Sequence, residues 1–254
     1  MKDQQSAAPQ AARIEAGDTV MLYDPSQGGN FVAELRERAF DIDYWQTQQA
    51  LRGAARGRGN TWFFNVGGRD HALRHYRRGG LIAKFSADRY LHLGLERARP
   101  VREFLLTQML HAAGLPVPAV VAARVERRGV FYRGDLITQR LPGVATLAER
   151  LGKGDLTRGC WHELGKMLAR FHDFGLDHAD LNAHNVLSDA LGSWWLIDFD
   201  RGQRRQRGLW CDDNLVRLRR SIVKISFNSG GVFGEHDWGA LLAGYREHTT
   251  AVIG

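Results

Sequence analysis

The stretch from His178 to Asp200 constrains the fold of this chain more than any other part of the sequence. It reads H-A-D-L-N-A-H-N-V-L, then S-D-A-L-G-S, then W-W-L-I-D-F-D. Two short apolar runs that flank a turn containing Gly192 predict a β-hairpin. Because a hairpin of this length folds back on itself, we expect it to bring Asp198 close to Asn185.

The polar residues of this stretch suit phosphoryl transfer. The pattern H-x-D-L-x-x-x-N is met by His178, Asp180, Leu181 and Asn185. Phosphoryl transfer depends mainly on positioning and electrostatics, and Mg²⁺ prefers oxygen ligands. Asp198 and Asn185 are therefore candidate magnesium ligands, and Asp180 is a candidate acceptor for a hydroxyl proton. An ordinary hairpin with polar surface residues is the alternative, but the apolar strand that ends in Asp-Phe argues against it.

The composition is that of an ordinary globular protein with an excess of positive charge. The chain has 254 residues, of which 44% are hydrophobic and 25% charged, enough for one large or two small domains. The net charge of +7 suggests an anionic partner, such as a nucleotide, a nucleic acid, a phosphorylated sugar or an acidic lipid surface. Cys160 and Cys211 form no disulfide framework or metal-binding spacing, so a reducing compartment fits.

Targeting signals are not evident in the sequence. The N-terminal residues lack the apolar core of a signal peptide, and no run approaches the ~20 apolar residues of a spanning helix. We therefore expect a cytosolic protein, or one attached to a membrane only at its surface.

The order of predicted elements indicates an α+β fold in two lobes. We expect residues 1–18 to form a disordered tail. Residues 19–141 should form a lobe of strands with one helix, from about Val101 to Ala113, where apolar residues recur at helical spacing. Pro142-Gly143 reads as a hinge, and residues 142–254 should form a lobe of helices around the hairpin.

A glycine-rich turn is the first candidate nucleotide site. Gly57-Arg-Gly59 runs into the predicted strand Trp62–Val66, and such a turn can cover phosphates with backbone N–H groups. Trp62 stands where G-x-G-x-x-G has its third glycine, so a plain hairpin turn remains the alternative.

A family resemblance extends from about Gly57 to Lys224. The runs that carry it are Gly57–Gly59, Leu73–Leu81, Asp88–Tyr90, Arg102–Phe104, Gly114–Pro118, His178–Asn185, Ile197–Asp200 and Asn214–Leu218. The most specific is Arg74-His-Tyr-Arg-Arg-Gly-Gly. With these runs the chain resembles the protein-kinase-like superfamily, and within it the 3-deoxy-D-manno-octulosonic acid (Kdo) kinases of Gram-negative bacteria.

This resemblance implies a two-lobed protein-kinase-like fold, with an antiparallel sheet and one helix in a small N-lobe and a mainly helical C-lobe. It implies ATP-dependent phosphorylation of the 4-hydroxyl of Kdo on the Kdo-lipid A precursor (Kdo-lipid IVA), in lipopolysaccharide core biosynthesis. The implied cofactors are ATP and Mg²⁺. The implied location is the cytoplasmic side of the inner membrane, as a peripheral protein.

The resemblance also assigns roles to residues. Asp180 takes the place of the catalytic base, and Asn185 and Asp198 take the places of the two metal ligands. Glu103 resembles the helix glutamate that steadies the nucleotide-binding cation. That cation is Arg74, at the expected strand position, or Lys84, in a V-A-I-K-like Leu-Ile-Ala-Lys. An arginine grips phosphate bidentately, whereas a lysine is a compact point charge.

Some positions depart from the protein-kinase pattern. Asn182 stands where Ser/Thr kinases usually have a lysine, Asp200 replaces the glycine of D-F-G, and no A-P-E segment follows. These departures favour a small-molecule or glycolipid kinase over a switchable protein kinase. We expect His178 to brace the loop rather than to carry protons, whereas His184 allows either role.

Competing interpretations include a heptose-kinase-like or aminoglycoside-kinase-like enzyme and a nucleotide-binding pseudokinase. The presence of Asp180, Asn185 and Asp198 disfavours the pseudokinase. The positive charge also raises a nucleic-acid-binding protein, but no recognised nucleic-acid motif supports it, so no nucleic-acid partner is expected.

An anionic membrane surface is a further expected partner. Each Lys or Arg near such a surface contributes about 1 kcal/mol to binding. The candidates for this contact are Arg204, Arg205 and Arg207, with Trp210 as an interfacial aromatic, and Arg217, Arg219 and Arg220.

Overall fold

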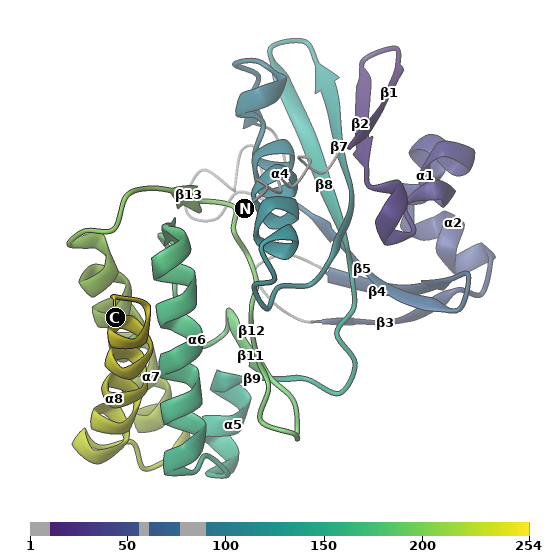
Figure 1. Ribbon diagram of the computed structural model, residues 1–254. Helices are drawn as coiled ribbons and strands as arrows, with labels where there is room; N and C mark the ends of the chain where they lie inside the picture. The colour runs from purple at the N-terminus through teal and green to yellow at the C-terminus, as the bar shows by residue number, and fades with distance from the viewer. Residues whose placement is uncertain (1–10, 56–60, 77–89, 254) are drawn as a thin grey trace, which may run out of the picture. The chain divides into compact units, whose positions relative to one another are not determined.

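The computed structural model of the protein describes residues 11–55, 61–76 and 90–253. Within it the chain forms two compact units (Figure 1). The first unit comprises Met1–Ala112 and Pro118–Arg140, and the second comprises Ala113–Val117 and Leu141–Gly254. The α+β class with a two-lobed plan is confirmed.

The first unit is built on an antiparallel sheet in the order β1-β2-β7-β8-β5-β4-β3, with β6 paired to β8. Its strands are β1 (Ala12–Ala16), β2 (Thr19–Tyr23), β3 (Leu51–Ala55), β4 (Thr61–Val66), β5 (Arg69–His75), β6 (Tyr90–Leu91), β7 (Val120–Arg128) and β8 (Phe131–Gln139). The first unit's helices are α1 (Asn30–Leu35), α2 (Ile42–Thr47) and α4 (Arg99–Ala112), with 3₁₀ turns at Pro25–Gln27, Arg36–Phe40 and Leu95–Arg97.

Each face of this sheet carries its own hydrophobic core. On one face Phe104 of α4 packs with Leu136 of β8. On the other, Trp45 of α2 packs with Phe64 of β4 and Leu73 of β5. Because side chains alternate along a strand, the burial of Leu73 in the second core turns the next residue of β5 towards the face that α4 covers.

The second unit is mainly helical. Its helices are α5 (Leu147–Lys153), α6 (Arg158–Phe174), α7 (Trp210–Ser229) and α8 (Glu235–Ile253). Two small sheets complete it: β9 (Ala145–Thr146), β11 (Val186–Ser188) and β12 (Trp194–Leu196) form one, and β10 (Leu176–Asp177) and β13 (Gln203–Arg204) form the other. The Thr157 side chain caps α6 at its start, and Gly175 ends it in the left-handed conformation at φ 91°.

The sequence predictions need two corrections here. The expected tail over residues 1–18 is wrong within the described part, because Ala12–Ala16 pairs along its whole length with β2 and Ile14 packs against the core; residues 1–10 lie outside the described residues. Ala113–Val117 was assigned to the N-lobe, but Pro116 accepts a hydrogen bond from the Leu196 N–H (3.1 Å) and belongs to the second unit.

Among the residues that the structure describes, no helix is long and apolar enough to cross a membrane.

Helices α6 and α8 approach each other so closely that only glycine fits at two positions. A Cβ on Gly165 would overlap the carbonyl oxygen of Leu241 and lie 2.8 Å from the backbone nitrogen of Tyr245. A Cβ on Gly244 would overlap the carbonyl oxygen of His162. Since all of these are backbone atoms of regular helices, a larger residue has to push the helices apart.

We therefore predict that Gly165→Ala lowers the free energy of unfolding by about 1–3 kcal/mol, the usual cost of overpacking. Urea unfolding followed by circular dichroism measures this change. Gly239→Ala is the matched control, because Gly239 lies on α8 with open space around it, and alanine there should stabilise the helix by up to about 1 kcal/mol. Equal effects of the two substitutions would contradict the close packing.

Candidate active site

The predicted hairpin is confirmed and holds two of the candidate residues at one end. Strand β11 pairs with β12 from Val186 opposite Leu196 onwards. Just beyond this pair, the Ile197 N–H donates a hydrogen bond to the backbone oxygen of Asn185 (3.0 Å). Asp198 follows directly, in the left-handed conformation at φ 69°, an uncommon conformation for a residue other than glycine. The backbone therefore brings Asn185 and Asp198 to the same end of the hairpin.

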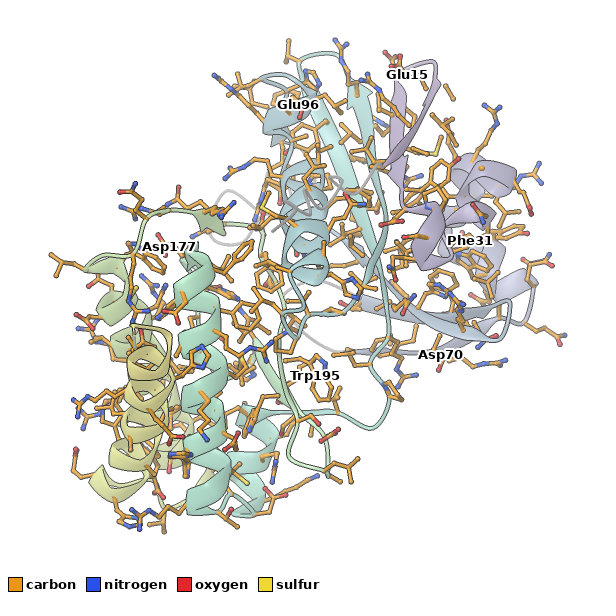
Figure 2. All side chains as sticks on the ribbon, viewed as in Figure 1. Glu15, Phe31, Asp70, Glu96, Asp177 and Trp195 are labelled. Carbon is orange, nitrogen blue, oxygen red and sulfur yellow. The ribbon has the colours of Figure 1, made fainter. Side chains whose placement is uncertain are left out.

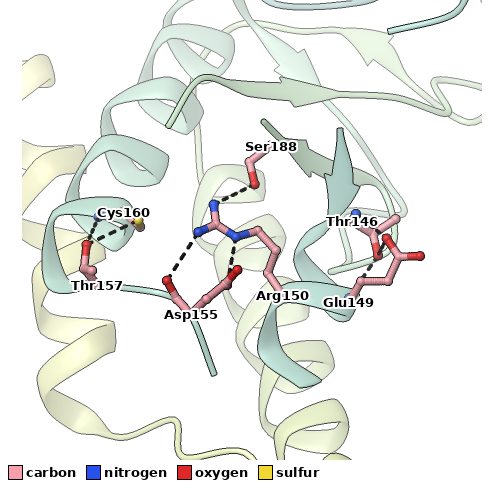
Figure 3. A network of polar contacts seen from close by, with 7 residues as sticks. All are labelled: Thr146, Glu149, Arg150, Asp155, Thr157, Cys160 and Ser188. Carbon is pink, nitrogen blue, oxygen red and sulfur yellow. Dashed lines mark hydrogen bonds and ion pairs between the residues drawn. The ribbon is translucent and has the colours of Figure 1, made fainter. Parts of the chain in front are cut away.

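A polar network from α5 supports the hairpin from its other end (Figure 3). The Arg150 guanidinium donates to the Ser188 hydroxyl of β11 (3.0 Å) and to the Asp155 carboxylate (3.0 Å). Its central carbon lies 5.9 Å from the Trp194 ring centre on β12. One side chain thus contacts both strands and ties them to α5.

The loop between β10 and β11 presents Asp180 to solvent. The Asp180 side chain is exposed, while its backbone oxygen accepts hydrogen bonds from the side-chain amides of Asn182 (2.9 Å) and Asn185 (3.0 Å). Because its amide nitrogen is engaged with Asp180, buried Asn185 keeps its side-chain oxygen as an acceptor. The loop therefore offers a carboxylate with a fixed backbone next to a fixed amide oxygen.

The donor set of this end of the hairpin fits magnesium. It consists of the Asn185 amide oxygen and the Asp198 carboxylate, both hard oxygen ligands, and Mg²⁺ typically takes one or two carboxylates and completes its shell with phosphate oxygens and water. Within the described ranges no group of three or more His, Cys, Asp and Glu side chains is placed to hold a metal. The assignment of Asn185 and Asp198 as metal ligands stays a prediction.

His178 is a buried residue that braces the loop. Its Nε2–H donates to the backbone oxygen of Ile197 (3.0 Å), and its ring lies 5.3 Å from the Phe199 ring. Burial lowers the pKa of His178, and the hydrogen bond to Ile197 only partly opposes this. The imidazole therefore links the start of the loop between β10 and β11 to the residues on either side of Asp198.

Helix α7 also supports β10 and the loop between β10 and β11, and the sequence analysis missed these contacts. The side-chain amide of Asn214 donates to the Asp177 carboxylate (3.3 Å), and the Ser221 hydroxyl accepts from the Ala183 N–H (3.1 Å). The run Asn214–Leu218 was noted only as part of the family pattern. An asparagine near the start of a long amphipathic helix was the one signal that could have pointed to this contact.

The first unit supplies a separate group of candidate residues. Arg74 of β5 forms an ion pair with Glu103 of α4, and its guanidinium donates to the Tyr76 hydroxyl (3.1 Å), which in turn donates to Glu103. Glu103 is buried, at 2% exposure. Burial and the nearby Glu103 carboxylate together raise the pKa of Tyr76. The arginine is thus held by two partners, with part of its side chain accessible.

The alternative cation and the glycine-rich turn cannot be compared with this pair. Lys84, Gly57 and Gly59 lie outside the described residues. Of the two candidate cations, Arg74 is the one whose pairing with the predicted glutamate the structure describes.

Three of the arginines expected at a membrane surface are exposed and also contact protein groups. Arg205 pairs with Asp177 (2.9 Å), Arg207 pairs with Asp173, and Arg204 stacks on the Phe174 ring at 4.7 Å. Trp210 was the aromatic candidate from this stretch. The interpretation of Trp210 as an interfacial group is wrong, because its side chain is buried at 7% exposure and its indole N–H donates to the Gln206 backbone oxygen (2.7 Å).

Arg207 also acts on a buried histidine in α6. Its guanidinium donates to the Tyr245 hydroxyl (2.9 Å), so that hydroxyl donates to Nδ1 of His172 (2.8 Å). Burial, assisted by the positive charge of Arg207, lowers the pKa of His172 to about 4. His172 is therefore neutral in the folded protein at neutral and mildly acidic pH.

Comparison with known proteins gives one consistent family. The model of the lipopolysaccharide kinase (Kdo/WaaP) family matches residues 42–245. A 3-deoxy-D-manno-octulosonic acid kinase of Photobacterium damsela subsp. piscicida is 39% identical over 226 residues, which cover 89% of this chain and 92% of that protein. The enzyme of the same name from Xylella fastidiosa (strain M12) is 46% identical over 185 residues, which cover 72% and 74%. That of Actinobacillus succinogenes is 40% identical, covering 82% and 90%.

The buried histidine predicts a pH dependence of stability. The unfolded chain takes up a proton on His172 below pH 6.5, whereas the folded protein resists it down to about pH 4. Stability is therefore lost as the pH falls through this window, by about 3 kcal/mol from this group. His172→Asn keeps an acceptor for Tyr245 and removes the titration, so its free energy of unfolding should fall less steeply between pH 6.5 and 4 in urea titrations. An unchanged slope would contradict the assignment.

Proposed function

Because this chain belongs to the lipopolysaccharide kinase (Kdo/WaaP) family, we propose that it transfers the γ-phosphoryl group of ATP to the 4-hydroxyl of Kdo on the Kdo-lipid A precursor, Kdo-lipid IVA. This reaction is a step of lipopolysaccharide core biosynthesis. The observation that carries the proposal is the exposed Asp180 on a fixed loop, together with Asn185 and Asp198 at one end of the hairpin.

Asp180 is the general base of this reaction. Its carboxylate faces solvent while two amide side chains hold its backbone, so it can meet a sugar hydroxyl without moving the loop. In the transition state it accepts the proton of the attacking hydroxyl, a contribution that is typically about 10²–10⁴-fold.

Asn185 and Asp198 are the residues that would hold magnesium. When bound, the ion supplies positive charge against the charge that develops on the transferring phosphoryl group. The hydrogen bond from Asn185 to Asp180 fixes the orientation of the amide for this purpose.

Arg74 is the candidate for the ATP phosphates. A guanidinium group binds phosphate bidentately. The Arg74 guanidinium is held in place by its contacts with buried Glu103 and Tyr76. Lys84 remains the alternative cation.

The names of the relatives support Kdo, whereas a heptose or an aminoglycoside acceptor would use the same loop and hairpin. A pseudokinase is disfavoured because the Asp180 side chain is exposed to solvent while its backbone is held in place by two hydrogen bonds.

A direct assay decides between these acceptors. With ATP and Mg²⁺, the protein should add one phosphate to purified Kdo-lipid IVA, located on the Kdo 4-hydroxyl by tandem mass spectrometry. Asp180→Asn should lower kcat by about 10²–10⁴-fold with ATP binding retained, whereas Arg74→Ala should mainly raise the KM for ATP. Phosphoryl transfer to a heptose or an aminoglycoside but not to Kdo would contradict the assignment of Kdo as acceptor. A fully active Asp180→Asn protein would contradict the assignment of Asp180 as general base.

We also propose that the protein works as a peripheral protein at the cytoplasmic side of the inner membrane, where a lipid-linked acceptor resides. The surface that best supports this is the outer face of α7. Val216, Val223 and Phe227 are 45%, 50% and 86% exposed, and Arg220 and Lys224 lie exposed among them. From Asn214 to Ser229 the helix carries no acidic residue. Exposed apolar residues flanked by cations are typical of helices that lie in an anionic interface.

The membrane proposal predicts salt-sensitive binding to vesicles. The wild-type protein should co-sediment with liposomes that contain anionic lipid, less so at high salt because exposed charges are screened over about 8 Å at physiological ionic strength. Arg220→Glu with Lys224→Glu should abolish the binding, and Phe227→Ser should weaken it. The control is Leu191→Ser, since Leu191 is 91% exposed and belongs to the hairpin turn rather than to α7. If vesicle binding is unchanged by salt and by these substitutions, the assignment of the α7 surface is contradicted, but the proposed kinase reaction is not.

A further inference from the structure

We infer that Asp177 is a positioning residue for the catalytic base, and that Arg205 is its partner from the chain segment that follows Asp198. The inference rests on the proposed kinase function and adds to it a link between the base and the metal-ligand segment. Asp177 directly precedes the H-x-D pattern, lies in β10 shortly after the C-terminal end of α6 (Figure 2), and is 7% exposed. The sequence analysis assigned no role to Asp177 and placed Arg205 only among the candidates for an anionic surface.

Four hydrogen bonds converge on the Asp177 carboxylate. One oxygen accepts from the Ala179 backbone N–H (3.2 Å) and the Asn214 amide (3.3 Å), and the other accepts from Arg205 (2.9 Å) and the Gln203 amide (3.3 Å). Burial raises the pKa of Asp177, but these hydrogen bonds together outweigh burial and hold it below its usual value. Asp177 is therefore a charged group that joins the loop, α7 and β13.

The hydrogen bond from Ala179 to Asp177 fixes the backbone immediately before Asp180, the proposed base. Ala179 has φ 49°, in the left-handed region that an alanine rarely adopts. Such a conformation persists only where its surroundings hold it, and the Asp177 carboxylate holds the N–H of this residue. Asp180 is the next residue along the chain, so Asp177 sets the direction in which the base leaves the loop.

The bond to Arg205 reaches the segment that carries the metal-ligand candidate. After Asp198 the chain turns at Gly202, whose N–H donates to the Phe199 backbone oxygen (2.8 Å), and then forms β13 beside β10. Asp177 pairs there with Gln203, and the Arg205 N–H donates to the Gly175 backbone oxygen (2.8 Å). The backbone contact and the ion pair together fix this segment to the residue that positions the base.

The test combines kinetics with hydrogen exchange on four single variants of the full chain. Asp177→Asn should lower kcat by about 10- to 100-fold with the KM for ATP nearly unchanged, the effect of misplacing a base by about 1 Å. Arg205→Ala should lower kcat about tenfold on the same grounds, and Arg205→Lys should recover part of that loss. Arg204→Ala is the matched control, because Arg204 directly precedes Arg205 but stacks on Phe174 and makes no contact with Asp177 among the hydrogen bonds and ion pairs described above.

Hydrogen exchange tests the coupling without an acceptor. Arg205→Ala should speed amide exchange in the peptide covering residues 178–185, whereas Arg204→Ala should leave it unchanged. All assays are run well below the melting temperature of each variant. Unchanged exchange in residues 178–185 together with wild-type kcat in Arg205→Ala overturns the inference. A wild-type protein that fails to phosphorylate Kdo-lipid IVA overturns the proposed function, and the exchange experiment still decides the coupling.

Discussion

The candidate site depends on the backbone hydrogen bond that closes the hairpin, from the Ile197 N–H to the Asn185 oxygen. A backbone bond requires no particular side chain, so the proximity of the two candidate metal ligands follows from strand pairing. Side chains then refine the arrangement: His178 reaches the Ile197 oxygen, and Arg150 contacts both strands. The site is therefore an end of a β-ladder whose polar residues are oriented by helices on its flanks.

Both units place a buried carboxylate beside a cation, and the reason is the same. A buried charge is costly unless it is paired and fully hydrogen-bonded. Glu103 therefore orders Arg74 and Tyr76 around itself, and Asp177 orders Arg205, Gln203 and Asn214. Ion pairs of this kind add little net stability, since desolvation offsets much of the attraction. What they provide is geometry, because their partners have few alternative positions that still satisfy the charge.

Much of this could be predicted from local pattern. The hairpin followed from two apolar runs around a glycine turn, and helix α4 (Arg99–Ala112) from the apolar residues that recur at helical spacing between Val101 and Ala113. Long-range partners could not be predicted, because nothing near Asp177 in the sequence shows that Arg205 and Asn214 return to it. The pairing of the first strand with β2 was hidden by its polar surroundings.

Exposure was misjudged at Trp210, in the segment after the hairpin. Arg204, Arg205 and Arg207 are exposed as the sequence suggested, although each side chain also contacts a ring or a carboxylate within the second unit. Trp210 fills a buried space beside His172. A sequence shows which residues can meet solvent, whereas the tertiary partners decide which of them do.

The left-handed backbone at Asp198 limits what evolution or design can place there. Aspartate, asparagine and glycine tolerate this conformation better than other residues. Glycine and asparagine would preserve the turn but remove the negative charge, and glutamate would preserve the charge but strain the turn. Aspartate is the one standard amino acid that meets both demands. Any variant that keeps both the turn and the negative charge at this position must therefore carry aspartate.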